Sequence, residues 1–125
     1  MKLSTITENH LYQKAYQKGK RFVTPALAVY VLPDYKAGKL QKAHPLHTRV
    51  NRIGLTVTKK IGGAVVRSRT RRILREAYYQ VAKEQSLKTG FLLVLVAREK
   101  AATMKSTDLA KDLSYALSRL DMILP

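Results

Sequence analysis

The sequence predicts an α+β fold, in which helices pack on a mixed four-stranded β-sheet. Hydrophobic residues alternate or cluster along several short segments, as in strands, and recur every three or four residues along longer ones, as in helices. The central order of strand, helix and strand favours a parallel pair of strands within the sheet. Because 125 residues is a usual length for one domain, we expect residues 1–125 to form a single domain.

The N-terminal part of the chain begins with a predicted helix over residues 8–18. Its apolar residues share one face, and Tyr12 and Tyr16 lie one turn apart on it. Gly19 follows the last helical position, where glycine is a typical stop signal. We therefore expect a short helix that ends at residue 18.

Two strands and a loop are predicted next. Residues 20–24 and 26–32 are rich in strand-forming residues, and Pro25 separates them. Residues 34–48 contain glycine, proline and two histidines without a regular period, so we expect an exposed loop there.

The remaining elements alternate between strand and helix. Residues 49–58 partly alternate in polarity, which predicts a strand, and residues 59–63 form a basic turn that contains glycine. A long helix is predicted over 64–84, and the apolar run 91–97 is typical of a strand buried on both faces. A leucine-rich helix from residue 106 or 107 to residue 123 completes the fold.

The charge of the chain predicts a polyanionic partner. Lys and Arg number 24 against 8 acidic residues, which gives a formal net charge of +16. A charge of this size repels itself, and a polyanion relieves the repulsion through the release of counterions. DNA, RNA and anionic lipid all fit this requirement, and nucleic acid fits it best.

Membrane and secreted classes are not favoured by the sequence. The longest apolar run, 91–97, is far shorter than the roughly 20 residues that span a bilayer. Residues 1–10 are polar and lack a signal-peptide stretch, and the chain has no cysteine for disulfides or thiolate metal sites. We therefore expect a cytoplasmic protein without a membrane partner.

Basic residues gather without acids in one segment, the turn at 59–63 and the first turns of the long helix. They are Lys59, Lys60, Arg67, Arg69, Arg71, Arg72 and Arg75. Cations at a helix start are opposed by the helix dipole, at roughly 0.3–1 kcal/mol each. Basic residues placed at a helix N-terminus against this preference, with no local compensation, indicate a functional site.

The spacing of these arginines predicts a surface for phosphates. Arg67, Arg71 and Arg75 recur every four residues as one ridge, which flanks the apolar face of the helix. One guanidinium group can donate two parallel hydrogen bonds to the oxygens of a phosphate. The free backbone N–H groups of residues 62–65 add a further anion site. The alternative is a solvated face with ion pairs, but only Arg72 has an acid, Glu76, at pairing distance along the helix.

Tyrosines provide a second candidate element. Tyr12, Tyr16 and Tyr30 combine an aromatic face with a polar tip, which suits stacking on unpaired bases at roughly 1–3 kcal/mol per base. The alternative is that these side chains are edges of the hydrophobic core, where aromatic residues are common.

Catalytic patterns are not evident in the sequence. It shows no paired carboxylates, nucleophile motif or phosphate loop, and His44 and His47 have no strong third ligand nearby. We therefore expect no catalytic residue in this chain.

Residues 52–76, RIGLTVTKKIGGAVVRSRTRRILRE, resemble the protein subunit of bacterial ribonuclease P. That family has a strand ending in Ser-Lys-Lys, a Gly-Asn-Ala-Val turn and a helix that opens with Arg-Asn-Arg and continues through Lys-Arg to Arg-Glu. The matching segments here are Thr58-Lys59-Lys60, Gly62-Gly63-Ala64-Val65, Arg67-Ser68-Arg69, Arg71-Arg72 and Arg75-Glu76. Gly63 and Ser68 replace the family's asparagines, and tyrosines replace the phenylalanines of the first helix.

The resemblance implies a particular version of the fold. It is a two-layer α/β sandwich with three helices and a left-handed βαβ crossover around the long helix. The same unusual crossover is found in the second domain of a small-subunit ribosomal protein. Left-handed crossovers are rare exceptions among parallel strands, and neither composition nor periodicity indicates one here.

The resemblance also implies a role as the non-catalytic protein subunit of a ribonucleoprotein endonuclease. The RNA subunit is the catalyst and uses Mg²⁺, and no protein partner is required. The catalytic RNA is bound by Lys59, Lys60, Arg67, Ser68, Arg69, Arg71, Arg72 and Arg75. The 5′ leader of precursor tRNA lies in a cleft between the long helix and the sheet, lined by Tyr12, Tyr16 and Tyr30. The alternatives are a ribosomal or general RNA-binding protein and, less favoured, a nuclease that acts alone.

Overall fold

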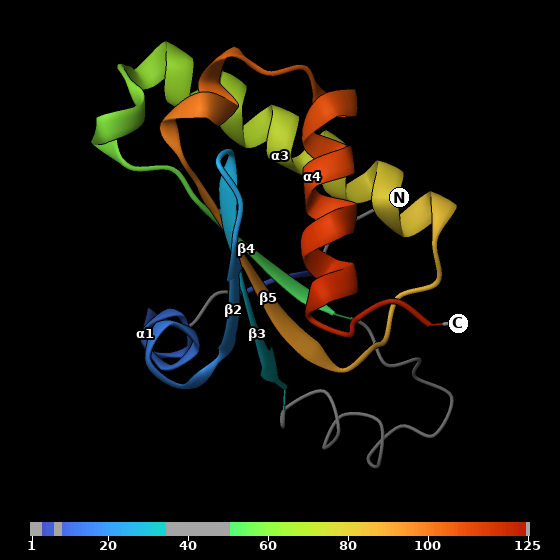
Figure 1. Cartoon of the computed structure of the whole chain (residues 1–125). Helices are drawn as coiled ribbons and strands as arrows, with labels where there is room; N and C mark the ends of the chain where they lie inside the picture. The colour runs from blue at the N-terminus through green and yellow to red at the C-terminus, as the bar shows by residue number, and fades with distance from the viewer. Residues whose placement is uncertain (1–3, 7–8, 35–50, 125) are drawn as a thin grey trace.

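The structure is a computed structural model that describes residues 4–6, 9–34 and 51–124 (Figure 1). Its strands are β1 (Ser4–Thr5), β2 (Lys20–Val23), β3 (Leu27–Pro33), β4 (Arg52–Thr56) and β5 (Phe91–Ala97). Its α-helices in these ranges are α1 (Asn9–Lys18), α3 (Ala64–Glu84) and α4 (Ser106–Arg119), and its short 3₁₀ helices are η1 (Lys59–Ile61) and η2 (Glu99–Thr103). Residue 8, the predicted loop over 35–48 and both His44 and His47 lie outside the described residues.

The strands form one mixed sheet in the order β1-β4-β5-β3-β2. β4 and β5 are parallel neighbours joined by α3, and β3 is antiparallel to both β5 and β2. The predicted mixed sheet of four strands is thus confirmed, and the two-residue β1 extends it beside β4. Two residues are too few to show a period, so the sequence did not reveal β1. The left-handed sense of the β4–α3–β5 crossover stays a prediction.

The main hydrophobic core lies between one face of the sheet and the helices α3 and α4 (Figure 1). Leu93 and Leu95 of β5 point into it, and Leu74 of α3 and Leu113 of α4 meet them with no exposed surface. At about 25 cal/mol for each Å² of buried apolar surface, this cluster is the main source of stability. It also holds α3 in a fixed position against the sheet.

The opposite face of the sheet is covered by α1, which lies across the sheet from α4 (Figure 1). Ala15 of α1 packs there with Leu32, Leu92 and Val94. The predicted α+β class is confirmed, and α1 covers the second face of the sheet in addition to the helices on the first. The cause is β5, whose adjacent residues Leu92 and Leu93 are 1% and 0% exposed, so that both faces need a cover.

The contact between α1 and the sheet depends on a missing side chain. Gly54 of β4 lies directly under the ring of Tyr12, and a Cβ atom at Gly54 would lie 2.6 Å from Tyr12 Cε1. This position therefore accepts only glycine without movement of the ring. Burial of the Tyr12 hydroxyl, with a smaller contribution from Tyr16, raises its pKa above the ordinary value of 10.0.

Element boundaries mostly follow the predictions, and α4 is the clearest exception. The helix ends at Arg119 instead of residue 123, because Asp121 takes a left-handed backbone conformation with φ of 59°. The amides of Asp121 and Met122 donate to the carbonyls of Ser118 and Leu117 at 3.1 and 2.9 Å, which caps the helix. Within the predicted strand over 49–58, residues 49 and 50 lie outside the described residues, and β4 covers Arg52–Thr56.

A buried ion pair joins the end of β3 to the start of β4. Arg52 donates to both carboxylate oxygens of Asp34, at 2.6 and 3.0 Å. The two side chains are 14% and 2% exposed, so the pair is almost completely desolvated. An ion pair of this kind adds little net stability, but removal of one partner leaves a buried charge.

Asp34→Asn should therefore lower the free energy of unfolding by about 3–5 kcal/mol in urea titrations at neutral pH. The matched control is Asp121→Asn, which removes a carboxylate that is 84% exposed and paired with Lys88 at 3.1 Å. That change should cost less than about 1 kcal/mol. Equal losses in the two variants would contradict the role given to the buried pair.

Gly54→Ala should force the Tyr12 ring away from the sheet and cost about 1–3 kcal/mol of stability through overpacking. The displaced tyrosine should also titrate closer to its ordinary pKa of 10.0, which an ultraviolet absorbance titration measures. Gly63→Ala is the control, because a Cβ atom there meets nothing within 4 Å. It should cost less than about 1 kcal/mol, as expected for glycine at a helix N-cap.

Candidate nucleic-acid interface

η1 and the first half of α3 lie at one end of the molecule (Figure 1), and they carry the basic residues predicted from the sequence. We call this region the basic arm; it comprises Lys59, Lys60, Arg67, Ser68, Arg69, Arg71, Arg72 and Arg75. Arg67 and Arg71 are half-buried, and the other members are exposed. The turn into α3 is made by Gly62, whose φ of 151° suits glycine and few other residues.

The first turn of α3 has no side-chain cap. Gly63 is the N-cap residue, and the first turn contains no acidic residue. The amide of Arg67 is the first to bond within the helix, at 2.9 Å to the carbonyl of Gly63. The preceding N–H groups of the helix therefore have no acceptor within it and offer a site for an anion.

The predicted ridge of Arg67, Arg71 and Arg75 lies along the flank of α3. Tyr78, one turn further along this flank, is buried in the main core. The ridge therefore lies beside the buried side of α3, and its position along the border with the sheet stays a prediction. The Nε atom of Arg67 is buried and has no hydrogen-bond partner among the described residues. Such groups are rare in folded proteins, and a partner outside the chain is one explanation.

The second row of arginines is partly engaged within the protein. Arg69 donates to the carbonyl of Ala102 in η2 at 2.7 Å, a contact that the sequence did not predict. Arg72 lies 3.8 Å from Glu76, which confirms the one pair expected from spacing. Both of its side chains are more than half exposed, so the pair is worth little. Arg69 thus also fixes the arm to η2.

The three predicted tyrosines come together on the sheet face that α1 covers. The rings of Tyr16 and Tyr30 meet edge to face, with centroids 5.0 Å apart and planes at 76°. The Tyr16 hydroxyl lies 2.8 Å from Thr56 Oγ1 at the end of β4. All three tyrosines are half-buried, so they form the edge of the smaller hydrophobic cluster and still present surface to solvent.

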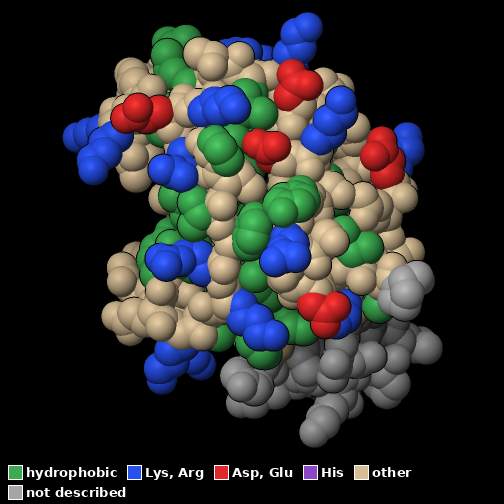
Figure 2. All heavy atoms as spheres, viewed as in Figure 1, with side chains coloured by type: hydrophobic (Ala, Val, Ile, Leu, Met, Phe, Trp, Pro, Cys, Tyr) green, Lys and Arg blue, Asp and Glu red, His purple; other side chains and the backbone are tan. Residues whose placement is uncertain are grey.

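A hollow lies on the side of the molecule that carries α1. Figure 2 shows it between the part of the molecule that carries α1 and the basic arm, with hydrophobic side chains inside and Lys and Arg side chains at its borders. The cleft expected between the long helix and the sheet was therefore misplaced. The main core fills that interface, and the tyrosines lie on the opposite face.

Sequence reasoning missed several residues on this face. Arg21 of β2 pairs in register with Tyr30, and Val96 of β5 pairs with Thr56. Because partners across strands share a face, these side chains lie on the tyrosine side of the sheet. Successive side chains of a strand point to opposite faces of the sheet, so the sequences of β2 and β5 show which residues share a face. Which of the two faces carries the tyrosines depends on the pairing register, which the sequence does not show.

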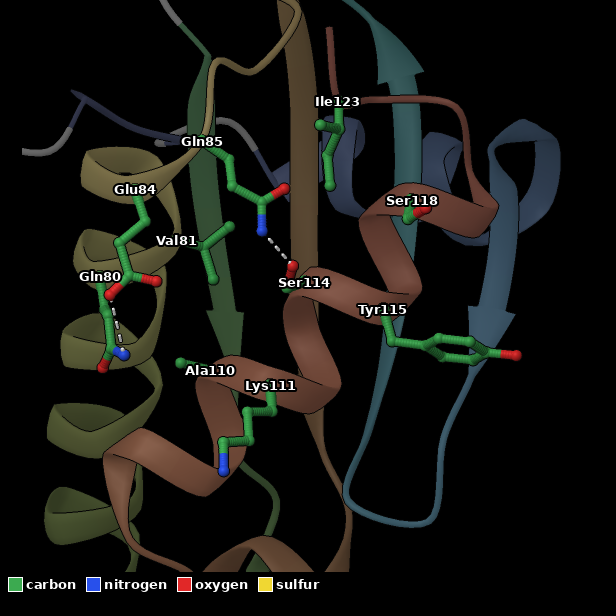
Figure 3. Close-up of a pocket in the computed structure, with 10 residues that line it drawn as sticks. All are labelled: Gln80, Val81, Glu84, Gln85, Ala110, Lys111, Ser114, Tyr115, Ser118 and Ile123. Atoms are coloured by element: carbon green, nitrogen blue, oxygen red, sulfur yellow. Dashed lines mark hydrogen bonds between the residues drawn. The ribbon is translucent and has the colours of Figure 1, made fainter. Parts of the chain in front are cut away.

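A second concave region lies between the C-terminal half of α3 and α4 (Figure 3). It has a volume of about 500 Å³. Amide and hydroxyl side chains dominate its lining, with Glu84 and Lys111 as its charged members. The Gln85 amide donates to Ser114 across it, as Figure 3 shows. This groove lacks the excess positive charge of the basic arm, so it is a poor site for a polyanion.

Two other kinds of site were sought in the described ranges. No group of three or more His, Cys, Asp or Glu side chains that could hold a metal ion occurs in residues 4–6, 9–34 and 51–124. Within the same ranges, no helix combines the length and the apolar character needed to cross a membrane.

Comparison with protein families matches residues 1–121 to the family described as Ribonuclease P. The ribonuclease P protein component of Bacillus mycoides is 34% identical, over 97% of this chain and 94% of that protein. The corresponding component of Clostridium acetobutylicum is 29% identical, over 99% of this chain and 94% of its own length.

Solved structures agree at the level of the fold. The ribonuclease P protein of Staphylococcus aureus superposes with a TM-score of 0.75 and 24% identity, covering 98% of this chain and all of that one. The protein from Thermotoga maritima gives a TM-score of 0.71 at 18% identity, covering 93% and 96% of the two chains. Because the family match spans nearly the whole sequence and includes the basic arm, this chain belongs to the ribonuclease P protein family.

Proposed function

We propose that this chain is the protein subunit of a ribonuclease P ribonucleoprotein and assists removal of the 5′ leader from precursor tRNA. The RNA subunit supplies catalysis, and the product is tRNA with a mature 5′ end. The observation that carries the proposal is that the basic arm borders a hollow on the side that carries α1 (Figure 2), the side of the sheet on which the three tyrosines lie. One suits a folded RNA backbone, and the other suits a single strand.

The basic arm is proposed to bind the catalytic RNA. Its arginines pair with phosphate oxygens, and the uncapped start of α3 offers backbone N–H groups to the same backbone. Ser68 is exposed between these arginines and adds a hydroxyl to the contact.

The hollow is proposed to hold the leader. Tyr12, Tyr16 and Tyr30 supply aromatic surface, and Arg21 adds a cation on the same face of the sheet. A single strand needs this combination of stacking surface and positive charge, whereas a duplex would hide its bases from the tyrosines. The strand would run between α1 and the basic arm.

The protein is proposed to act through charge and position in the cytoplasm, without another protein partner. Mg²⁺ is expected to serve the RNA subunit. The described residues of this chain contain no cluster of carboxylates or histidines that fits a metal ion of its own, so we assign the ion no ligand here. A net charge of +16 lowers the repulsion between the two RNA molecules, which lessens the need for cations from solution.

Cleavage of precursor tRNA by the cognate catalytic RNA at low magnesium concentration tests the proposal directly. Addition of this chain should increase the single-turnover cleavage rate, because the protein replaces part of the cation requirement. Binding of the RNA without any stimulation would contradict the proposal and favour a general RNA-binding protein. Cleavage by the chain without the RNA subunit would contradict the assignment of catalysis to RNA.

The salt dependence of binding to the catalytic RNA tests the ridge. A triple variant with Arg67→Ala, Arg71→Ala and Arg75→Ala should flatten the plot of log affinity against log salt by about one unit of slope per lost contact. The matched control carries Lys83→Ala, Lys111→Ala and Arg119→Ala, exposed residues outside the basic arm that remove the same formal charge. Equal slopes for the two triple variants would show that net charge matters and the ridge does not.

A further inference from the structure

Two hydroxyl groups meet on the sheet face that carries the three tyrosines. The Tyr16 hydroxyl and Thr56 Oγ1 are 2.8 Å apart, and either oxygen is placed to act as the donor. Both residues are half-buried, so the pair is neither fully exposed nor sealed in the core. The neighbouring side chains of this cluster, among them Tyr30, Val94 and Val96, are mostly apolar or aromatic.

The chemistry of the pair limits what it can recognise. Each hydroxyl has one hydrogen and two acceptor lone pairs, so one bond between them leaves a second hydrogen and several lone pairs for a ligand. Because the bond reverses, the pair presents a donor or an acceptor as required. It therefore tolerates the polar edge of any base and gives little discrimination between bases.

The same pair discriminates strongly between a polar group and no group. If the bound ligand has no polar group at this position, the half-buried hydroxyl is left without a hydrogen bond. Water replaces that bond poorly, because the surroundings are apolar. The 2′-hydroxyl of ribose is both donor and acceptor, it occurs in every RNA nucleotide, and DNA lacks it. A reversible hydroxyl pair beside a stacking surface matches this group irrespective of base sequence.

We propose that the Tyr16–Thr56 hydroxyl pair recognises a ribose 2′-hydroxyl of the strand in the hollow and makes this site selective for RNA over DNA. The inference rests on the proposed function, in which that strand is the leader. Stacking on the tyrosine rings supplies affinity that is independent of the sugar. The hydroxyl pair adds selectivity for the sugar.

The test uses the chain assembled with the cognate catalytic RNA and a precursor tRNA whose leader nucleotides carry either ribose or 2′-deoxyribose. For the wild-type chain, the ribose leader should bind about three- to ten-fold more tightly, as expected for one hydrogen bond. The double variant Tyr16→Phe with Thr56→Val should bring this ratio close to one, mainly through weaker binding of the ribose leader. Thermal unfolding verifies that the double variant is folded.

Two single variants serve as controls. Tyr115→Phe removes an exposed tyrosine hydroxyl on α4, on the other face of the sheet, and Thr56→Ser keeps the Thr56 hydroxyl, so both should retain the wild-type ratio. A purely structural role for the pair would lower binding of both leaders equally and leave the ratio unchanged.

The possible outcomes separate the two proposals. A wild-type ratio near one, or a ratio that survives in the double variant, would overturn ribose recognition while leaving leader binding intact. If omission of the protein changes the affinity for neither leader, the proposed function fails and ribose recognition fails with it.

Discussion

The structure depends on one strand, β5, which is apolar on both sides. Leu93 and Leu95 require the cover that α3 and α4 provide, whereas Leu92 and Val94 require the cover that α1 provides. The short α1 covers only part of its face, and the hollow in Figure 2 opens between it and the basic arm. The candidate site therefore follows from the need to bury a central strand with helices of unequal length.

The long helix divides its two tasks between its two halves. Buried residues Ala77, Tyr78 and Val81 dock the second half on the core, and Ile73 and Leu74 extend this packing to the middle of the helix. The first half carries arginines against the helix dipole and has no cap, which costs stability locally. Packing of the second half offsets this cost, so the charged start of α3 stays ordered where RNA is expected to contact it. The bond from Arg69 to Ala102 holds the same region from its other side.

Long periodic elements could be predicted from the sequence, whereas contacts across strands could not. α3 and β5 have the predicted bounds because their patterns are long and their ends carry clear signals. The early end of α4 rests on the backbone conformation of Asp121, which no period reveals. The arginine ridge was visible from its spacing, but the face on which the tyrosines meet depends on the register of β2, β3 and β5. That register is a property of the folded sheet, and so the position of the hollow was missed.

The two departures from the family pattern affect the contact surface more than the fold. Gly63 lies in open space, where a larger side chain meets no atom within 4 Å, and its φ of −70° suits any residue. Glycine at an N-cap costs only a few tenths of a kcal/mol relative to asparagine, so the exchange hardly alters the helix. What changes is access: without a side chain at Gly63, the first N–H groups of α3 are open to an anion such as the phosphate of the proposed RNA contact. Ser68 is exposed as well and keeps a short polar group between Arg67 and Arg69. Under the proposed function, the two positions would therefore offer a backbone N–H contact and a hydroxyl contact where the family pattern has asparagine.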